Sequence, residues 1–388
     1  MKPLDNIRIA IAGGGTGGHV FPGIAIAKAL SASINVDLMW IGTGRPVEKQ
    51  AIAKEGYDLK VLKVKPIKGS GPGAVAKAMA GLPLSIAKAA AMLYRFKPDI
   101  VLGVGGYVAG PVLVAAYLLR IPTALHEQNV IPGLANKLAA RFTQRLFVSF
   151  PETKRYFPEK EVTISGNPVR SDLIEQAKRY KRPSNGCKRI LVLGGSQGAR
   201  GINEMVTSAL ISVWNSGHII SVMHQTGEAD LEWVQAQYAK AEVPSEVNPF
   251  LTDIGTHLGW ADLVIARAGA GTVAELAAVG RPALLIPYPH AASGHQDANA
   301  EYLASAGGAL IFKEGETGAV KLASAIQDLL DEPKKLKQMA QKAKAVGKTD
   351  AADTIAKGLI QMVNKKKEQE NKTVLNLQSG QSLEKSHV

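Results

Sequence analysis

The sequence predicts an α/β protein built from two doubly wound domains, each with a parallel sheet covered by helices on both faces. Three observations lead to this prediction. The chain has 388 residues, more than one hydrophobic core usually organises. Short β-rich segments alternate with helical segments along the chain. A strand, a glycine-rich loop and a helix follow one another twice, from Ile7 and again from Lys188, which indicates one such unit per domain.

The strands of the two predicted sheets are short apolar segments bounded by turn residues. In the first half we expect strands at Ile7–Ala12, Val36–Ile41, Ile100–Val104, Thr123–His126 and Leu146–Phe150. In the second half we expect them at Lys188–Leu193, Ile219–His224, Leu263–Ala266 and Ala283–Pro287. Pro168 and Pro183 interrupt the pattern between the halves. We therefore predict domains at residues 1–166 and 167–345, a terminal amphipathic helix at 346–364 that packs back on the first domain, and a disordered polar tail at 365–388.

Composition restricts the cellular setting of the protein. A single cysteine, Cys187, excludes an internal disulfide and suits a reducing compartment. No stretch approaches the roughly 20 apolar residues that cross a bilayer. The net charge is +13, and residues 1–180 hold 24 of the 46 Lys and Arg but only 12 of the 33 Asp and Glu. The basic first half therefore predicts an anionic partner such as a nucleic acid, an anionic membrane or a phosphorylated ligand.

The first glycine loop, Gly13–Gly18, directly follows the first strand. Its glycines allow a ligand to approach the backbone, and the helix after it offers free N–H groups to an anion. The loop also satisfies the dinucleotide fingerprint, but that site needs an acidic residue at the end of the second strand, and Asp37 lies at its start. His19 follows the loop. It is a candidate general base for an acceptor hydroxyl, and a packing or capping histidine is the alternative.

A second cluster, Arg267–Glu275, opens a helix after the strand Leu263–Ala266. Its small residues suit a phosphate at a helix N-terminus, with Thr272 as a hydroxyl donor. Glu275 suits ribose hydroxyls. The spacing of Thr272 and Glu275 is also that of a capping box, in which the two residues would satisfy the start of the helix.

Polar residues also follow several other predicted strands, where open α/β sheets bind ligands. Gln296 and Asn299 share one helix face, and their amides suit sugar hydroxyls. Arg170 lies near the domain boundary, where it suits a diphosphate. Ordinary turn or surface chemistry is the alternative for each. Two further loops belong to this group, Gly103–Tyr107 and His126–Asn129.

Together these motifs resemble the MurG family, in family order over roughly residues 7–363. The matching segments are Gly14–Gly23, Gly105–Gly110, His126–Asn136, Gly166–Arg170, Gly194–Ala199, His224–Gly227 and Arg267–Glu275. The resemblance implies a GT-B fold, in which two Rossmann-like domains hold the active site in the cleft between them. It implies an inverting transferase that moves N-acetylglucosamine from UDP-GlcNAc to lipid I and forms lipid II in peptidoglycan synthesis. It implies no cofactor and no metal at the site.

The resemblance also assigns residues by position. His19 is the implied catalytic base, and Tyr107 and Glu127 would face the acceptor. The implied UDP-GlcNAc contacts are Thr16, Gly17, Gly18, Asn129, Arg170, Ser196, Phe250, Leu251, Ala270, Gly271, Thr272, Val273, Ala274, Glu275, Gln296 and Asn299. The chain departs from many relatives in one place, because Ser293 and Gly294 stand before His295 and Gln296 where relatives have an acidic residue. Sugar contacts from that loop are therefore less certain than those from the first glycine loop.

Residues 54–97 carry nine basic and two acidic residues and include an apolar stretch at 74–94. This combination predicts a peripheral contact with an anionic membrane surface, which the resemblance places on the cytoplasmic face. An ordinary helix with a solvated basic face is the alternative. The resemblance further implies other cell-wall synthesis proteins as partners.

Three other functions fit parts of the sequence. A lipid glucosyltransferase would share the donor loops and differ in its acceptor. A UDP-GlcNAc 2-epimerase would act on the nucleotide sugar alone. Nucleic-acid binding rests only on net charge, since aromatic residues make up 5% of the chain and no binding motif is present. We therefore expect no nucleic-acid partner.

Overall fold

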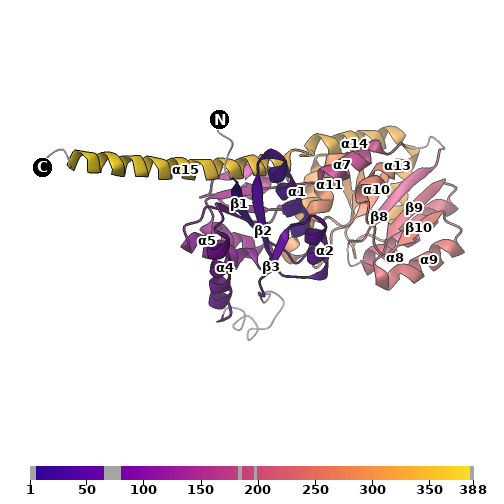
Figure 1. Cartoon of the computed structure of the whole chain (residues 1–388). Helices are drawn as coiled ribbons and strands as arrows, with labels where there is room; N and C mark the ends of the chain where they lie inside the picture. The colour runs from indigo at the N-terminus through magenta and orange to yellow at the C-terminus, as the bar shows by residue number, and fades with distance from the viewer. Residues whose placement is uncertain (1–5, 65–79, 182–185, 196–198, 385–388) are drawn as a thin grey trace.

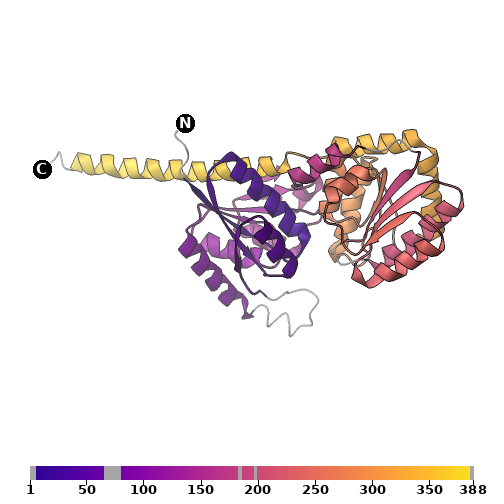
Figure 2. The same ribbon diagram turned by 45° about the vertical axis from the view of Figure 1, so that its right-hand side comes forward.

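The computed structural model describes residues 6–64, 80–181, 186–195 and 199–384. Two parallel sheets lie in separate domains, and a long C-terminal helix lies along the first domain and then extends beyond it (Figures 1 and 2). In both sheets the strand carrying the glycine loop is central. The predicted α/β class with two Rossmann-like domains is confirmed.

The first sheet has seven strands in the order β3-β2-β1-β4-β5-β6-β7, all parallel. Its strands are β1 Ile7–Ala12, β2 Val36–Gly42, β3 Asp58–Val61, β4 Ile100–Gly103, β5 Thr123–Glu127, β6 Arg145–Val148 and β7 Val162–Ile164. Its helices are α1 Gly17–Ser33, α2 Pro46–Lys54, α4 Leu82–Phe96, α5 Ala109–Leu118 and α6 Leu134–Ala139, with short 3₁₀ turns at Ala140–Phe142 and Pro151–Tyr156.

The second sheet has six parallel strands in the order β10-β9-β8-β11-β12-β13. Its strands are β8 Lys188–Leu193, β9 Ile220–Gln225, β10 Ser245–Asn248, β11 Leu263–Ala266, β12 Ala283–Leu285 and β13 Ala309–Ile311. The helices after β7 are α7 Ser171–Arg179, α8 Arg200–Asn215, α9 Leu231–Lys240, α10 Ile254–Trp260, α11 Ala270–Val279, α12 His295–Ser305, α13 Ala319–Asp331, α14 Pro333–Val346 and α15 Ala351–Glu384, with 3₁₀ turns at Glu228–Asp230 and Ala292–Gly294.

All nine predicted strands are present, with ends shifted by two residues or fewer. The sequence missed four strands: β3, β7, β10 and β13. Each of these lies at or beside a sheet edge or is only three or four residues long, and none of them is buried throughout. They therefore lack the continuous apolar pattern by which a central parallel strand is found.

Each sheet is buried on both faces because alternate residues of a strand point to opposite sides. In β1, Ile9 and Ile11 pack in one cluster with α1 and α15, whereas Ala10 and Ala12 pack in another with α4 and α5. In β8, Leu191 faces the side covered by α7, α10 and α11, and its neighbours in sequence face α8 and α13. This layering leaves the carboxyl ends of the strands as the edge at which loops gather.

The C-terminal helix α15 returns the chain to the first domain. Ile355, Leu359 and Val363 are buried against the α1 face of the first sheet. The helix does not end near residue 364 but continues to Glu384, so residues 365–384, which we expected to be disordered, are helical. Two features explain the continuation: no proline interrupts the segment, and Lys366 pairs with Glu370 one turn later at 3.6 Å.

Within the described part of the chain, no helix is long and apolar enough to cross a membrane. Within the segment 54–97 that is predicted to meet a membrane surface, residues 65–79 lie outside the described residues. Most of the apolar part, 74–94, forms α4, whose buried side consists of Ser85, Ala89 and Leu93.

Helix α15 has a glycine at the place where it comes closest to the first sheet. A β-carbon on Gly358 would lie 2.6 Å from Cζ of Phe147, a fully buried ring on β6. We predict that Gly358→Leu lowers the free energy of unfolding by about 1–3 kcal/mol, because the ring has no space into which it can move. Chemical denaturation of the full chain measures this. Lys357→Leu, on the exposed side of the same turn, is the matched control and should change stability by less than about 0.5 kcal/mol. Equal effects of both variants would contradict the close packing.

Candidate active site

The first glycine loop lies at the carboxyl edge of the first sheet, against the loop that follows β4. A β-carbon on Gly13 would lie 2.3 Å from Val104, and one on Gly106 would lie 2.5 Å from the carbonyl oxygen of Gly14. Gly106 also has a φ of 81°, which disfavours side chains. Glycine is therefore required on both sides of this contact, and the two loops approach each other backbone to backbone.

Side chains from β2 and from α2 hold the same loop. Trp40 donates from Nε1 to the carbonyl oxygen of Gly13 at 2.8 Å. Glu48, with 1% of its surface exposed, accepts from the N–H of Gly15 at 3.3 Å and from the hydroxyl of Thr43 at 2.6 Å. A loop fixed in this way presents its remaining N–H groups without rearrangement.

Sequence reasoning missed Glu48. The dinucleotide fingerprint places its acidic residue at the end of the second strand, whereas Glu48 lies beyond that strand, in α2. Only the three-dimensional structure brings its carboxylate under Gly15. An acidic residue, Glu48, therefore does lie near the carboxyl end of β2, but its carboxylate accepts from the backbone of the glycine loop.

Helix α1 begins with the residues predicted to contact the donor. Thr16 is its N-cap and makes no side-chain capping bond, and Thr16 and Gly18 are exposed. Gly17 is half-buried. A hydroxyl and free N–H groups at a helix N-terminus suit an anionic ligand.

His19 is the third residue of α1 and is partly exposed. Its Nδ1 lies 3.2 Å from Oε1 of Gln128. Burial is the main cause that lowers the pKa of His19, and the hydrogen bond to Gln128 opposes it. The imidazole is therefore neutral at neutral pH, the state that a general base requires.

Arg170 lies where the two domains meet. Its guanidinium carbon lies 5.4 Å from the ring centre of Phe21 on α1, and Nη1 lies 3.7 Å from the carboxylate of Asp172. The charge of Arg170 also acts on Glu275 on α11. Burial raises the pKa of Glu275 to about 7, and the positive charge of Arg170 acts against that rise. The positive charge of Arg170 thus lies close to residues of both α1 and α11.

Helix α11 starts at Ala270, with Gly269 in the N-cap position and no side-chain cap. The interpretation of Thr272 and Glu275 as a capping box is therefore wrong, because Thr272 lies inside the first turn. Of the six residues predicted to contact the nucleotide, Gly271, Thr272, Ala274 and Glu275 are partly exposed, and Ala270 and Val273 are buried. Helices α1 and α11 are in contact across the domain boundary.

Two asparagines predicted to bind the donor bind each other across the domain boundary. Nδ2 of Asn299, on α12, donates to Oδ1 of Asn129 at 3.1 Å and lies 3.2 Å from the carbonyl oxygen of Ala268. Its Oδ1 accepts from the N–H of Val130 at 3.0 Å. Asn299 is fully buried. In this structure its side chain therefore joins the domains, and its contact with the donor stays a prediction.

Glu127 does not face open space, although we expected it to face the acceptor. It is 1% exposed and accepts from the N–H of Asn129 at 2.8 Å and from Nδ2 of Asn136 at 2.7 Å. A further bond from the N–H of Gly133 measures 3.3 Å. Burial raises the pKa of Glu127 against the effect of these bonds. Its carboxylate organises the loop after β5, whereas Tyr107, after β4, exposes 36% of its surface.

In the second domain, Gln225 joins the second glycine loop to the predicted uracil site. Its Nε2 donates to the carbonyl oxygen of Gly195 at 2.7 Å, and its Oε1 accepts from the N–H of Leu251 at 3.1 Å. Leu251 is buried and Phe250 is 54% exposed. Ser196 lies outside the described residues. An exposed ring beside a fixed backbone suits a planar base.

Gln296, in the first turn of α12, and Arg267, directly after β11, both hold the loop that follows β12. Oε1 of Gln296 accepts from the N–H of Tyr288 at 2.9 Å. Arg267 donates to the carbonyl oxygens of Ile286 and Pro287 at 3.2 and 3.1 Å and pairs with a carboxylate on the loop after β13. Arg267, the first residue of the segment Arg267–Glu275 predicted to bind a phosphate, thus has its guanidinium bonded to these loops.

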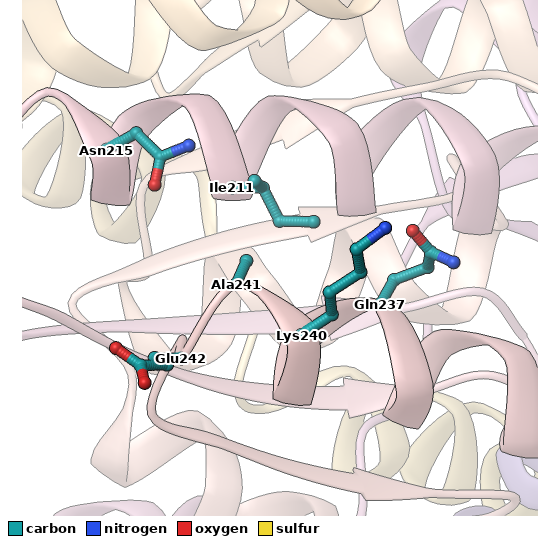
Figure 3. Close-up of a pocket in the computed structure, with 6 residues that line it drawn as sticks. All are labelled: Ile211, Asn215, Gln237, Lys240, Ala241 and Glu242. Atoms are coloured by element: carbon teal, nitrogen blue, oxygen red, sulfur yellow. The ribbon is translucent and has the colours of Figure 1, made fainter.

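Two other observations bear on ligands. Among the residues that the structure describes, no group of three or more His, Cys, Asp or Glu could hold a metal ion. A surface hollow of about 470 Å³ lies between α8 and α9, as Figure 3 shows. Its lining residues are Ile211, Asn215, Gln237, Lys240, Ala241 and Glu242. These lie at the carboxyl ends of the two helices, at the opposite edge of the sheet from the glycine loops, so the hollow is not part of the candidate site.

Comparison with known proteins agrees with this geometry. The model of the glycosyltransferase family 28 N-terminal domain matches residues 9–148, and that of the C-terminal domain matches residues 189–355. An N-acetylglucosamine transferase from Myxococcus xanthus, named for UDP-N-acetylglucosamine and N-acetylmuramyl-(pentapeptide) pyrophosphoryl-undecaprenol, is 43% identical over 90% of this chain and 91% of its own length.

Solved structures share the fold. MurG from Acinetobacter baumannii is 30% identical, with a TM-score of 0.75 over 92% of this chain and 99% of that one. A UDP-GlcNAc 2-epimerase from Neisseria meningitidis, solved with UDP-GlcNAc, superposes with a TM-score of 0.66 over 92% and 100% of the two chains, but its 14% identity shows only a common fold. The chain is therefore a glycosyltransferase of family 28 and belongs to the MurG family.

Proposed function

We propose that this protein transfers N-acetylglucosamine from UDP-GlcNAc to lipid I, the undecaprenyl-diphosphoryl N-acetylmuramyl-pentapeptide, and so forms lipid II in peptidoglycan synthesis. Relatives that are about 40% identical over nearly their whole length are named for this reaction. The observation that carries the proposal is the contact between α1, which holds a neutral histidine, His19, in its first turn, and α11, which holds Glu275. Arg170 lies at the same junction, because its guanidinium is 5.4 Å from the ring centre of Phe21 on α1 and its charge acts on Glu275.

The donor would lie mainly on the second domain. Phe250 would stack on the uracil, and the backbone at Leu251 would meet its edge. Glu275 would accept hydrogen bonds from the ribose hydroxyls. The diphosphate would lie against the N-terminus of α11, with Arg170 as its cation, and Gln296 would contact the sugar.

The reaction then needs one proton acceptor and one stabilised leaving group. The acceptor hydroxyl oxygen attacks C1 of the N-acetylglucosamine from the side opposite UDP, which inverts the configuration. The C1–O bond to the diphosphate breaks, and UDP leaves with that electron pair. His19 receives the hydroxyl proton. Arg170 and the N–H groups at the helix N-termini stabilise the negative charge that develops on UDP.

An anionic membrane surface is the proposed partner of the first domain, at the cytoplasmic face where the lipid acceptor is held. On α4, Leu84 is 61% and Tyr94 is 71% exposed, and Lys88 and Arg95 are exposed beside them. Helix α5, which packs on α4, ends in Tyr117 and Leu118, both more than half exposed. Helix α6 packs on α5 and adds exposed leucines and a lysine. Large apolar side chains interspersed with cations suit the interface of an anionic bilayer. Contacts with other proteins of cell-wall synthesis belong to the same proposal.

The proposed reaction is tested by incubating the protein with labelled UDP-GlcNAc and lipid I in detergent. We expect labelled lipid II. Binding of UDP-GlcNAc without transfer would contradict the proposed acceptor and favour another lipid acceptor. Conversion of UDP-GlcNAc to its 2-epimer without lipid would indicate the epimerase reaction instead.

We predict that His19→Ala lowers kcat by about 10²- to 10⁴-fold, because the acceptor loses its base. Affinity for UDP-GlcNAc should change by less than about twofold, since the proposed donor contacts lie on other residues. Steady-state kinetics and calorimetry measure the two quantities. His257→Ala, on α10, is the matched control and should keep full turnover. Unchanged turnover in the His19 variant would remove it from the mechanism.

Affinity for UDP-GlcNAc should depend on pH through Glu275. Its pKa is raised to about 7, so it is ionised above pH 7 and accepts from two ribose hydroxyls, whereas below pH 7 it is protonated and accepts less well. We therefore predict about tenfold weaker binding at pH 6 than at pH 8. Calorimetry with UDP-GlcNAc, whose diphosphate does not titrate in this range, tests this. Glu275→Gln should bind weakly at both pH values, and an unchanged pH dependence in that variant would argue against the ribose contact.

The membrane contact predicts a salt-sensitive interaction with anionic vesicles. Lys88→Glu combined with Arg95→Glu should weaken binding to phosphatidylglycerol vesicles by at least about tenfold, since each basic residue contributes about 1 kcal/mol. Vesicle sedimentation measures the bound fraction. The matched control combines Lys240→Glu with Lys321→Glu, two exposed residues of the second domain. Equal losses in both double variants would show that only net charge matters.

A further inference from the structure

The side chain that contacts His19 is itself held in a single orientation. Gln128 directly follows β5 and is 2% exposed. Its Nε2 lies 2.8 Å from the carbonyl oxygen of Val104. A carbonyl oxygen only accepts hydrogen bonds, so the amide nitrogen must be on that side. The amide oxygen, Oε1, then faces Nδ1 of His19 at 3.2 Å.

This orientation determines where the imidazole carries its proton. An amide oxygen cannot donate, so the hydrogen bond exists only when Nδ1 of His19 bears the hydrogen. In a neutral ring the other nitrogen, Nε2, is then unprotonated and basic. The Nδ1 side of the ring also lies against Gly105, where a β-carbon would be 2.7 Å from Nδ1. Nδ1 of His19 therefore lies on a covered side of the ring, between Gly105 and Gln128.

A second histidine supports Gln128 from behind. The remaining hydrogen of Nε2 of Gln128 points to Nδ1 of His126 at 3.1 Å. Nε2 of His126 lies 3.3 Å from the carbonyl oxygen of Gly166 and from the hydroxyl of Ser149. His126 is fully buried, and burial lowers its pKa to about 4, so it is neutral. With Nδ1 accepting and Nε2–H donating, every hydrogen bond in the series has one donor and one acceptor.

We propose that Gln128 is a positioning residue that fixes the tautomer of His19, with the proton on Nδ1 and with Nε2 free to receive the proton of the acceptor hydroxyl. His126 holds Gln128 in this orientation and connects it to Gly166, where the chain leaves the first domain. The inference rests on the proposed function, in which His19 is the base.

The other charged and titratable groups that face His19 do not fix its tautomer. His126, beyond Gln128, and His295, on α12 of the second domain, disfavour a positive charge on or near His19 when they are protonated. The hydrogen bond to the backbone carbonyl of Val104 raises the pKa of His19, as the bond to Gln128 does. Among these groups, Gln128 is the side chain whose acceptor oxygen lies at Nδ1 and whose orientation is fixed by a second hydrogen bond.

The direct test is the ¹⁵N NMR spectrum of histidine-labelled full-length protein near pH 7.5, with the His19 signals assigned from their loss in His19→Ala. We expect a pyrrole-type nitrogen at Nδ1 and a pyridine-type nitrogen at Nε2. The opposite tautomer in the unmodified protein would overturn the proposal without any variant. This measurement needs no acceptor, so it stands apart from the proposed reaction: absence of transfer with the expected tautomer would refute only the function.

Two substitutions at Gln128 separate positioning from packing. Gln128→Leu keeps the volume but removes the acceptor, so the single tautomer should be lost and kcat should fall at least about tenfold, with KM for UDP-GlcNAc within about twofold. Gln128→Glu keeps an acceptor oxygen opposite Nδ1 of His19, and its second oxygen has to be protonated to donate to the carbonyl oxygen of Val104 as Nε2 of Gln128 does. Its kcat should therefore be higher than that of Gln128→Leu, and the Nδ1-protonated tautomer of His19 should return.

The matched control is Gln235→Leu, an exposed glutamine on α9 whose amide donates to a backbone carbonyl at 3.3 Å. It should leave kcat, the pH profile and the His19 signals unchanged. Loss of activity in Gln128→Leu with an unaltered His19 tautomer would contradict the proposal, as would a folded Gln128→Glu variant in which the tautomer does not return. Thermal unfolding of each variant identifies losses that arise from misfolding.

Discussion

The backbone contact between the first glycine loop and the loop after β4 is the constraint on which the site depends. Gly13 lies so close to Val104, and Gly106 so close to Gly14, that no β-carbon fits on Gly13 or Gly106. Because the loops touch, the start of α1 lies next to the loop after β4, and His19 comes within hydrogen-bond distance of Gln128 at the end of β5. Three neighbouring strands of the sheet thus end in one rigid group. Strand order makes this contact, since β1 and β4 pair at the centre of the sheet, where the order of connections reverses.

The fold was predictable because its signal is local. Central parallel strands are continuously apolar, and the strand, glycine loop and helix unit occurs twice. Short or edge strands such as Asp58–Val61 and Ser245–Asn248 have no such signal, because solvent reaches part of them. The helix after residue 364 was missed for a related reason. Its polar composition gives no apolar stripe, and its helical state extends from the buried turns at Ile355 and Leu359.

The candidate site was predictable in its residue types but not in their partners. Motifs located His19, Arg170 and Glu275, which the structure brings to one junction. They did not distinguish a polar group that faces a ligand from one that holds a loop, because both stand at the carboxyl ends of strands. Glu127 and Asn299 are of the second kind in this structure, with their hydrogen bonds directed to loop backbone and to the other domain. Glu48 and Gln128 act on residues 33 and 109 positions away, a relation that no local pattern contains.

The chain crosses between the domains twice, after Gly166 and again before α15. The two crossings touch: a β-carbon on Gly166 would lie 2.4 Å from Cβ of Lys348 and 3.3 Å from that of Ala351. Two covalent connections that meet at one place act as a pivot. A rotation of the domains about that place would leave the two connections together, so an opening for substrate would be widest at the far side of the junction. The carbonyl oxygen of Gly166 also accepts the hydrogen bond from His126. The point about which the domains would rotate is therefore linked to His19 by the hydrogen bonds of His126 and Gln128.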